Sequence, residues 1–392
     1  MTSERRKGTD LRSPQDGVLM SDPVWEYRSL KREIDGAIAG VLERGLLDWG
    51  PEVPAFEEAF ARWSGVAYAV GFNSGMAALK VALKALGVGP GDEVITVPNS
   101  DISTTSAIHH VGAKSVWVDV ERDTMTMDPV LVEEAITERT KALLPVHLYG
   151  HPADMKAICE LASKYRLFVI EDACLAVGAS IDGRPVGRWG DVGCFSHAPS
   201  KHLGACGSAG TAVTDDESLA ERMRLLAGYG ESRQRKTCDG KAGQSQHYVA
   251  EGFNERMDEL QASILSVKLS RLGEWVAARR ANAGAYSDAF RATGIRLPIE
   301  RPGCRHTYRN YIIRVSRRER TQRALADAGI ASGQVYVPPL HLQPVYRRLG
   351  HKRGAYPVTE EACATLLSVP VGPHVSPAQR KLVIRTLARL EA

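Results

Sequence analysis

Short apolar runs rich in β-branched residues alternate with longer segments of helical periodicity over the first half of the chain. In one helical segment Leu79, Leu83 and Leu86 recur on a single face. Strands that are apolar throughout and that alternate with helices are typical of a mainly parallel sheet covered on both faces. The pattern therefore predicts an α/β fold, with strands over 66–72, 93–97, 114–120, 142–148 and 167–172, and with helices over 76–86, 128–136 and 153–165.

The same pattern predicts how the chain divides into domains. Residues 1–21 are polar and contain Gly and Pro, so we expect a mobile tail. Residues 22–255 are expected to form a large domain, and residues 256–392 a long helix followed by a smaller α+β domain. Further predicted elements are helices over 27–44, 54–63, 256–289 and 318–328, a helix from Pro377, and strands over 191–197, 208–214 and 311–315.

Composition and charge narrow the class of function. The 392 residues carry a formal net charge of +4, which does not favour nucleic acid or a membrane surface as a partner. The sequence shows neither a signal peptide nor an apolar run long enough for a transmembrane helix, so we expect a cytoplasmic protein. The seven cysteines are scattered without any CxxC pair, which argues against a disulfide framework and a structural zinc site, and no metal is expected.

Lys201 is the residue most suggestive of chemistry. It lies in a small, semi-apolar turn, where an ammonium group is costly unless its pKa falls or the amine reacts. Upstream, the predicted strand 167–172 ends in Asp172. A pyridoxal phosphate enzyme needs this combination, because the lysine holds the cofactor as a Schiff base and the carboxylate pairs with the pyridinium nitrogen. Taken alone, this pair of residues is weak support, since most lysines are exposed to solvent.

A third feature lies before these two in the chain. Ser74 and Gly75 follow a predicted strand and open a predicted helix, so their N–H groups and hydroxyl form a candidate anion site. The alternative is a tight turn with an ordinary N-cap. Ser196, shortly before Lys201, is placed to donate to the same phosphate. No dinucleotide or Walker pattern is present, so a bound dinucleotide or nucleoside triphosphate is not indicated.

With these residues in place, the chain resembles the DegT/DnrJ/EryC1/StrS family of sugar aminotransferases, which are fold-type I, pyridoxal phosphate-dependent enzymes. The resemblance extends from about Trp25 to the C-terminus. It is carried by long and specific stretches, at 50–58, 89–95, 144–155, 252–261 and 339–343.

The resemblance implies roles for particular residues. Lys201 would hold the cofactor, and Asp172 would keep the pyridine nitrogen protonated. The phosphate would be lined by Ser74, Gly75, Met76 and Ser196, with Asn254 contributed by the partner subunit. The segments that border the sugar pocket would include His306, Tyr311, Tyr336 and His341. The family also implies a homodimer whose active sites are shared across the interface.

The chain departs from the family at the cofactor. Leu175 occupies the position of a glutamine that donates to the cofactor's phenolic oxygen, and leucine cannot donate. Asp101 lies near the position of an aromatic residue that stacks on the cofactor ring. Its carboxylate would instead meet a substrate amine or hydroxyl, unless the two sequences are offset by a residue or two and another side chain covers the ring. Smaller departures are His202 in place of asparagine, and Val335 and Val337 beside Tyr336.

The expected reaction transfers an amino group from glutamate or glutamine to a ketone, most simply that of a nucleotide-linked keto-deoxysugar. Arg233, with Arg235 and Lys236, lies in a basic segment that would either face the sugar's diphosphate or form a solvated loop. One alternative is amination of a free keto-cyclitol or a scaffold-bound keto-sugar. Another is a non-catalytic paralogue with a structural or regulatory role, which the departures at Leu175 and Asp101 keep open.

Overall fold

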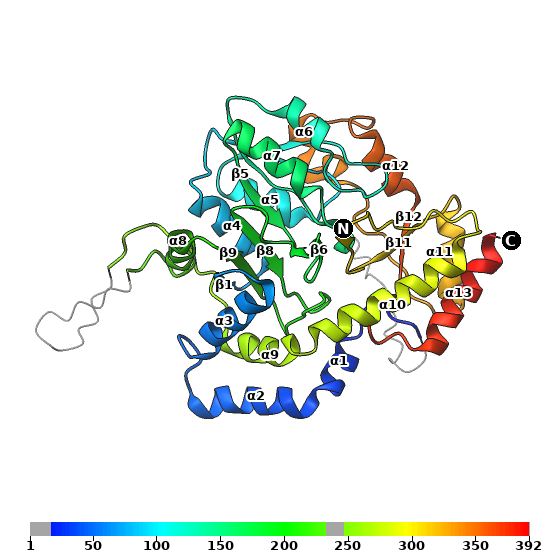
Figure 1. Cartoon of the computed structure of the whole chain (residues 1–392), viewed down its shortest axis with the longest axis horizontal. Helices are drawn as coiled ribbons and strands as arrows, with labels where there is room; N and C mark the ends of the chain where they lie inside the picture. Colours follow the sequence, from blue (N-terminus) through cyan, green and yellow to red (C-terminus); the bar gives the residue numbers. More distant parts are fainter. Residues whose placement is uncertain (1–16, 233–246, 392) are drawn as a thin grey trace, which may run out of the picture.

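The computed structural model describes residues 17–232 and 247–391 and is built on a seven-stranded sheet of order β1-β9-β8-β5-β4-β2-β3 (Figure 1). Only β9 runs antiparallel to its neighbours within this sheet, as expected for a mainly parallel α/β fold. The strands are β1 (Tyr68–Phe72), β2 (Glu93–Thr96), β3 (Lys114–Trp117), β4 (Thr140–Leu143), β5 (Phe168–Asp172), β8 (Val192–Ser196) and β9 (Gly210–Thr214).

Helices cover both faces of the sheet. One face packs against α4 (Gly75–Ala85), α5 (Ile102–His110) and α8 (Glu217–Ala227), where alanines and leucines of α4 are fully buried. The other face is covered by α3 (Glu52–Ser64), α6 (Pro129–Ala135), α7 (Met155–Tyr165) and α9 (Glu259–Leu269). Helices α1 (Pro23–Ser29) and α2 (Lys31–Arg44) pack outside α9. None of the helices described for 17–232 and 247–391 has the length and apolar character that crossing a bilayer requires.

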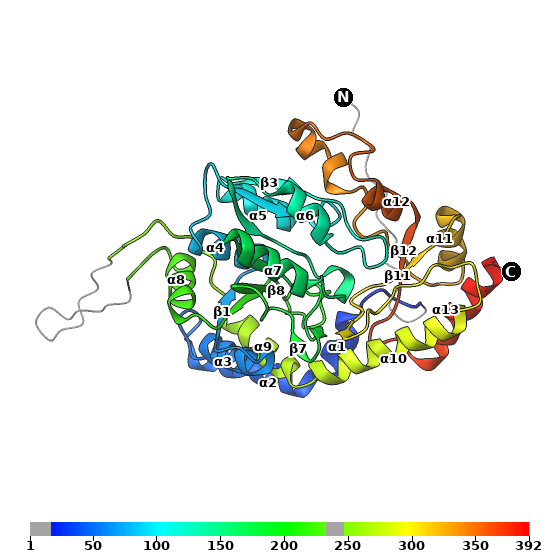
Figure 2. The same cartoon turned by 45° about the horizontal axis from the view of Figure 1, so that its top comes forward.

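A second hydrophobic core is formed by the C-terminal part of the chain. It contains the two-stranded sheet of β11 (Tyr311–Arg314) and β12 (Leu366–Val369), packed against α10 (Leu272–Phe290), α11 (Arg318–Asp327) and α13 (Pro377–Glu391). Figures 1 and 2 show α10 as the long helix that runs from α9, below the main sheet, to α11 and α13. The helical pattern over 256–289 thus forms two helices, α9 and α10, separated at Ser270–Arg271, instead of one.

The packing of these helices bears on the domain boundary. Leu265, Leu272 and Val276 belong to the core shared with α3 and the main sheet, whereas Ala283 and Tyr286 belong to the second core. We propose that the boundary falls within α10, later than the expected position at 256. Val18, which lies within the expected tail of 1–21, is 2% exposed, bridges Ile330 and belongs to the second core.

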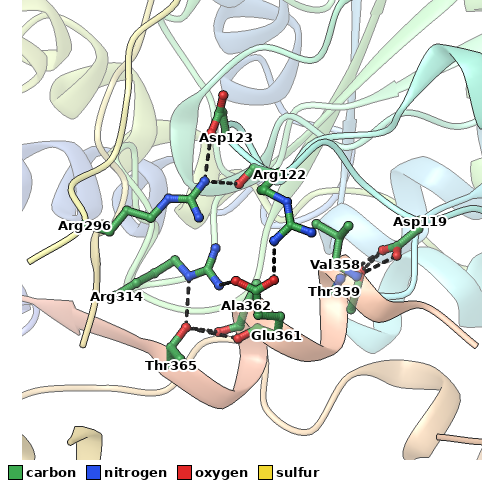
Figure 3. Close-up of polar contacts among 10 residues, drawn as sticks. All are labelled: Asp119, Arg122, Asp123, Arg296, Arg314, Val358, Thr359, Glu361, Ala362 and Thr365. Carbon is green, nitrogen blue, oxygen red and sulfur yellow. Dashed lines mark hydrogen bonds and ion pairs between the residues drawn. The ribbon is translucent and has the colours of Figure 1, made fainter. Parts of the chain in front are cut away.

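A network of polar contacts fixes the loop after β3 to the second core (Figure 3). Asp119 is buried and accepts hydrogen bonds from Val358 N at 2.8 Å, Thr359 N at 2.9 Å and Thr359 Oγ1 at 2.8 Å. These N–H groups begin α12 (Pro357–Thr365), whose own preceding residue supplies no side-chain cap. Nearby, the Glu361 carboxylate accepts from Arg122 and from Arg314. The N-terminal donors of α12 are therefore satisfied by a residue far away in the sequence.

We expect Asp119→Ala to lower the free energy of unfolding by about 1–2 kcal/mol, because it removes a helix cap and leaves buried donors without partners. Asp123→Ala is the matched control, since its exposed carboxylate pairs with Arg296 at 2.8 Å and an exposed pair contributes less than about 1 kcal/mol. Denaturant unfolding of both variants checks the difference. Equal losses in the two variants would show that Asp119 does not cap α12.

Candidate active site

The candidate site lies at the carboxyl ends of the parallel strands, where open α/β sheets bind their ligands. Residues after β1, β2, β4 and β5, and the last residue of β8, meet at this edge. They line one pocket, formed by Gly75, Met76, Leu79, Ser100, Asp101, Ser103, Val146, Asp172, Cys174, Leu175, Ser196, Lys201 and Tyr336. The fold thus gathers residues that are far apart in the sequence, from Gly75 to Tyr336.

Asp172 is the last residue of β5 and is 4% exposed. Its Oδ2 accepts a hydrogen bond from Thr104 Oγ1 at 2.7 Å, and its Oδ1 accepts one from Cys174 N at 3.2 Å. The Thr104 hydroxyl lies 2.7 Å from Ser100 Oγ, which extends the network along the pocket wall. These contacts fix the orientation of a buried carboxylate at the pocket, as a partner for a protonated ring nitrogen requires.

The preceding acid, Glu171, has a different role. It is fully buried and accepts hydrogen bonds from Gly187 N, Trp189 N and Gly190 N at 2.7–2.9 Å, and its Oε2 lies 2.9 Å from His147 Nε2. His147 Nδ1 accepts from a backbone N–H, so Nε2 carries the proton and donates to Glu171. Of the two adjacent acids, only Asp172 lines the pocket.

Lys201 reaches the pocket from the turn after β8. The turn is closed by a hydrogen bond from Lys201 N to Ala198 O at 2.8 Å, and Ala205 N donates to His197 O at 2.8 Å. Burial lowers the pKa of the Lys201 amine, although the neighbouring Cys174 and Asp172 oppose the shift. A lowered pKa increases the fraction of neutral amine at a given pH, and the neutral amine is the nucleophile.

The turn before α4 has the features of an anion cradle. Ser74 caps α4, with its Oγ accepting from Ala77 N at 3.1 Å. A Cβ on Gly75 would lie 2.7 Å from Ser196 Cβ, so only glycine allows the helix N-terminus to approach the end of β8 this closely. The helix N-terminus, Ser74 and Ser196 therefore surround one small space, which suits a phosphate group.

The remaining walls include both predicted departures. Leu175 is 5% exposed and presents an apolar surface to the pocket. The Asp101 carboxylate accepts from Ser103 N at 2.9 Å and from Ser103 Oγ, so it caps α5 while it lines the pocket. Ile102, the next residue, is 46% exposed. Burial raises the pKa of the Tyr336 hydroxyl, which therefore stays protonated near neutral pH.

Taken together, the pocket fits pyridoxal phosphate. It offers an amine with a lowered pKa for the aldehyde, a fixed carboxylate for the ring nitrogen and a helix N-terminus for the phosphate. Sequence reasoning did not anticipate Leu79 of α4 as a lining residue, nor a further five lining or supporting residues, Ser100, Ser103, Thr104, Val146 and Cys174. The position of these five after strands β2, β4 and β5 is the feature that would have identified them.

Three residues that were expected to border the sugar pocket lie outside this pocket in the structure. Tyr311 faces the second core and bonds Ser287 Oγ at 2.9 Å, because β11 packs against α10. His341 bonds Glu360 at 3.0 Å. His306 is buried against Tyr308, with its ring centroid 3.9 Å from that of Tyr308, and it lines a separate cavity with His151. These three therefore do not line the pocket of their own chain.

The remaining expected site residues are Asn254 and Arg233. Asn254 is exposed, and its carbonyl accepts from Asn73 Nδ2 at 3.3 Å, so it is not in the pocket of its own chain. Arg233, like Arg235 and Lys236, lies outside the described residues.

Comparisons with known proteins agree with this geometry. Residues 28–388 match the DegT/DnrJ/EryC1/StrS aminotransferase family. The chain is 42% identical to dTDP-3-amino-3,4,6-trideoxy-alpha-D-glucose transaminase of Streptomyces venezuelae, over 91% of this chain and 92% of that protein. It is 38% identical to UDP-N-acetyl-3-dehydro-alpha-D-glucosamine 3-aminotransferase of Acidithiobacillus ferrooxidans, over 95% and 97% of the two chains. A crystal structure of S. venezuelae DesV, solved in complex with a ketimine intermediate, superposes with a TM-score of 0.91 at 40% identity, covering 96% of this chain and 99% of that one.

Proposed function

Since the chain belongs to the DegT/DnrJ/EryC1/StrS aminotransferase family and is a pyridoxal phosphate-dependent sugar aminotransferase of fold-type I, we propose that it aminates the ketone of a nucleotide-linked keto-sugar. We propose glutamate or glutamine as the amino donor. The observation that carries this function is the convergence of Lys201, Asp172 and the Ser74–Gly75 turn on one pocket. The nucleotide is supported by the two relatives named for dTDP- and UDP-linked sugars.

The proposed roles follow from the contacts. Lys201 Nζ would hold the cofactor's aldehyde carbon covalently, and Gly75 and Met76 N–H groups, with the Ser74 and Ser196 hydroxyls, would hold its phosphate. Asp172, oriented by Thr104, would hold the ring nitrogen in its protonated form. When bound, pyridoxal phosphate supplies a ring that accepts the electron pair left when a proton leaves the donor's α-carbon.

Lys201 would then act a second time, as an acid and base. Once the donor's nitrogen replaces it, the Lys201 amine is positioned to take the proton from the donor's α-carbon. In the second half of the reaction it returns a proton to the carbon that carried the ketone of the sugar. Burial keeps the amine neutral over a wider pH range, because a lowered pKa disfavours its protonated form.

A shared dimer is also part of this proposal. Trp49 is 50% exposed and Val249 is 65% exposed, and both line one surface groove, with Val249 five residues before Asn254 in the sequence. Large exposed apolar side chains that gather on one surface are typical of a subunit interface. We propose that a second copy covers this surface and that its Asn254 reaches the first copy's phosphate site. Light scattering at twice the mass of one chain supports the dimer, and a monomer in active solution would exclude it.

We also propose a cytoplasmic location. The six cysteines among the described residues are free, which suits a reducing compartment.

The function is tested by following the two half-reactions separately. Purified protein loaded with pyridoxal phosphate is mixed with glutamate or glutamine, and the keto-acid product is measured. The resulting protein is then mixed with keto-sugars carried on dTDP or UDP, and with a free keto-cyclitol, and the amine is detected by mass spectrometry. Conversion of the cyclitol alone would favour the alternative substrate, and absence of any half-reaction would contradict an aminotransferase.

Leu175 provides a direct test of cofactor contacts. We expect Leu175→Gln to tighten cofactor binding about 3- to 10-fold, because glutamine can donate one hydrogen bond that leucine cannot. The same change is expected to destabilise the cofactor-free protein, since it places an amide in a buried site. Leu175→Met is the matched control of similar volume. Titration of both variants with cofactor checks the prediction, which fails if methionine and glutamine tighten binding equally.

A further inference from the structure

The loop that carries Arg309 is fixed against the turn that carries Lys201. His202 Nε2 lies 3.1 Å from Thr307 O, and Thr307 N donates to Gly150 O at 2.9 Å. On the other side of Arg309, Asn310 N donates to Tyr149 O at 3.3 Å. A Cβ at Gly150 would lie 2.9 Å from Arg309 N, so the close approach of the two segments depends on glycine. The backbone of Arg309 is therefore held firmly beside the Lys201 turn.

The Arg309 side chain is not itself among the residues that line the pocket, but its charge acts on two that are. Burial lowers the pKa of Lys201, and the positive charge of Arg309 lowers it further. Burial raises the pKa of Tyr336, whereas Arg309 acts in the opposite direction. The charge of Arg309 therefore acts on two side chains that line the pocket, Lys201 and Tyr336. The Arg309 Nε is closed to solvent and has no hydrogen-bond partner among the residues of 17–232 and 247–391.

A second arginine lies behind the first. Arg279, on α10, is 2% exposed, and its Nε and Nη1 likewise lack partners within the described part of the chain. Burial and the charge of Arg309 lower the pKa of Arg279 to about 9. Two guanidinium groups therefore lie close together with unused donors, an arrangement that costs free energy unless an anion joins them.

The charges around this pair do not neutralise it. Glu26 is the carboxylate whose charge acts on both arginines, and its Oε2 already accepts from Lys268 Nζ at 3.1 Å. The neighbouring His202 is kept neutral, because burial, followed by the charges of Arg279 and Arg309, lowers its pKa well below the usual value. The negative charges of Asp172 and Asp101 also act on Lys201. Asp172 is already held by the hydrogen bond from Thr104, and Asp101 caps α5. A positive excess remains beside Lys201.

We propose that Arg309 binds the carboxylate of the amino donor, and that Arg279 behind it keeps this subsite positively charged. The inference rests on the proposed aminotransferase function and names the donor subsite of that reaction. The donor's nitrogen takes the position of Lys201 Nζ, and its α-carboxylate is two bonds from that nitrogen, so a cation is needed close to Nζ. A guanidinium binds a carboxylate through two parallel hydrogen bonds, which also orients the donor.

His202 has a positioning role in this account. Its side chain holds Thr307 O, two residues before Arg309, and the family resemblance places asparagine at this position. An asparagine side chain is shorter and would not reach Thr307 O from the same position. We therefore treat His202 and Arg309 as parts of one local adaptation. His202→Asn is therefore expected to shift donor affinity in the same direction as a change at Arg309, with a smaller size.

Arg309→Gln tests the proposal through the two half-reactions. We expect the KM for glutamate to rise about 10- to 100-fold, since a charge-assisted hydrogen-bonded pair is lost, while the KM for the keto-sugar changes less than about 2-fold. Arg309→Lys should recover part of the donor affinity by restoring the charge. Arg305→Gln is the matched control on the same segment, with an exposed side chain, and should leave both values unchanged.

A binding measurement separates this inference from the function itself. Glutarate, which has carboxylates and no amine, is titrated calorimetrically into the cofactor-loaded wild type and into Arg309→Lys, with melting curves to confirm folding. Weaker glutarate binding in Arg309→Lys than in the wild type supports the subsite. If the wild type binds glutarate but does not react with glutamate, that result contradicts the proposed function and leaves the subsite supported. Unchanged glutarate binding, or a rise in KM confined to the keto-sugar, overturns the proposal.

Discussion

Replacing Lys201 with alanine is expected to lower the rate of amino transfer about 10³- to 10⁴-fold, because one amine both holds the cofactor and moves the proton. Lys201 lines the pocket that also contains Asp172, and burial lowers its pKa so that it is available as a base. Within 17–232 and 247–391, no other lysine lines this pocket. Stopped-flow measurement of the half-reaction with glutamate checks the size of the loss.

Two comparisons make the Lys201 result specific. Lys156→Ala is the matched control, since this exposed lysine pairs only with Asp182 and should leave the rate unchanged. A small primary amine added to Lys201→Ala should restore part of the rate, because it can accept the proton in place of the missing side chain. A rate for Lys201→Ala within about tenfold of the wild type would rule out its role as base.

Asp172→Asn is expected to lower the rate about 100- to 1000-fold, or about 3–4 kcal/mol, at the lower end of the about 3–5 kcal/mol typical of removing one member of a buried charge pair. Asparagine has the same shape, its Oδ1 can still accept from Cys174 N, and its Nδ2 can donate to Thr104 Oγ1, so the fold should survive. The lost charge would no longer hold the ring nitrogen protonated. Steady-state rates and melting curves of the same preparation separate chemistry from stability.

Glu171→Gln provides the contrasting control for Asp172. Glu171 accepts three backbone hydrogen bonds and is clear of the pocket, so this variant should lose stability and keep its rate per folded molecule. The account of the two acids is wrong if Asp172→Asn loses stability and keeps its rate.

Hydrophobic patterning predicted the sheet and the residues at its edge. The observed β1, β2, β5, β8 and β9 begin and end within a few residues of the predicted runs, because strands buried on both faces of a sheet are near-continuous apolar runs. The strand predicted over 142–148 is instead β4, at Thr140–Leu143. Residues 144–148 are equally apolar but form a buried connection that leads Val146 to the pocket. Periodicity alone cannot separate a buried loop from a strand.

The sequence did not predict the direction in which individual side chains point. Tyr311 and Tyr336 are both tyrosines of the C-terminal part of the chain, yet the partly buried Tyr336 lines the pocket and the buried Tyr311 packs in the second core. Arg309 gave no indication of its position, because its proximity to Lys201 depends on contacts with Gly150 and His202 far away in the chain. Asp101 was expected to meet a substrate amine or hydroxyl, and its role as the cap of α5 emerges only with the helix itself.

The central claim is that Lys201 holds pyridoxal phosphate covalently and is displaced from it by an amino donor. It is tested most directly by borohydride reduction of the cofactor-loaded protein, followed by peptide mapping, before and after incubation with glutamate. The account predicts a cofactor adduct on the peptide containing Lys201, and its disappearance after glutamate with release of 2-oxoglutarate. An adduct on another lysine, or an adduct on Lys201 that neither glutamate nor glutamine removes, would contradict it.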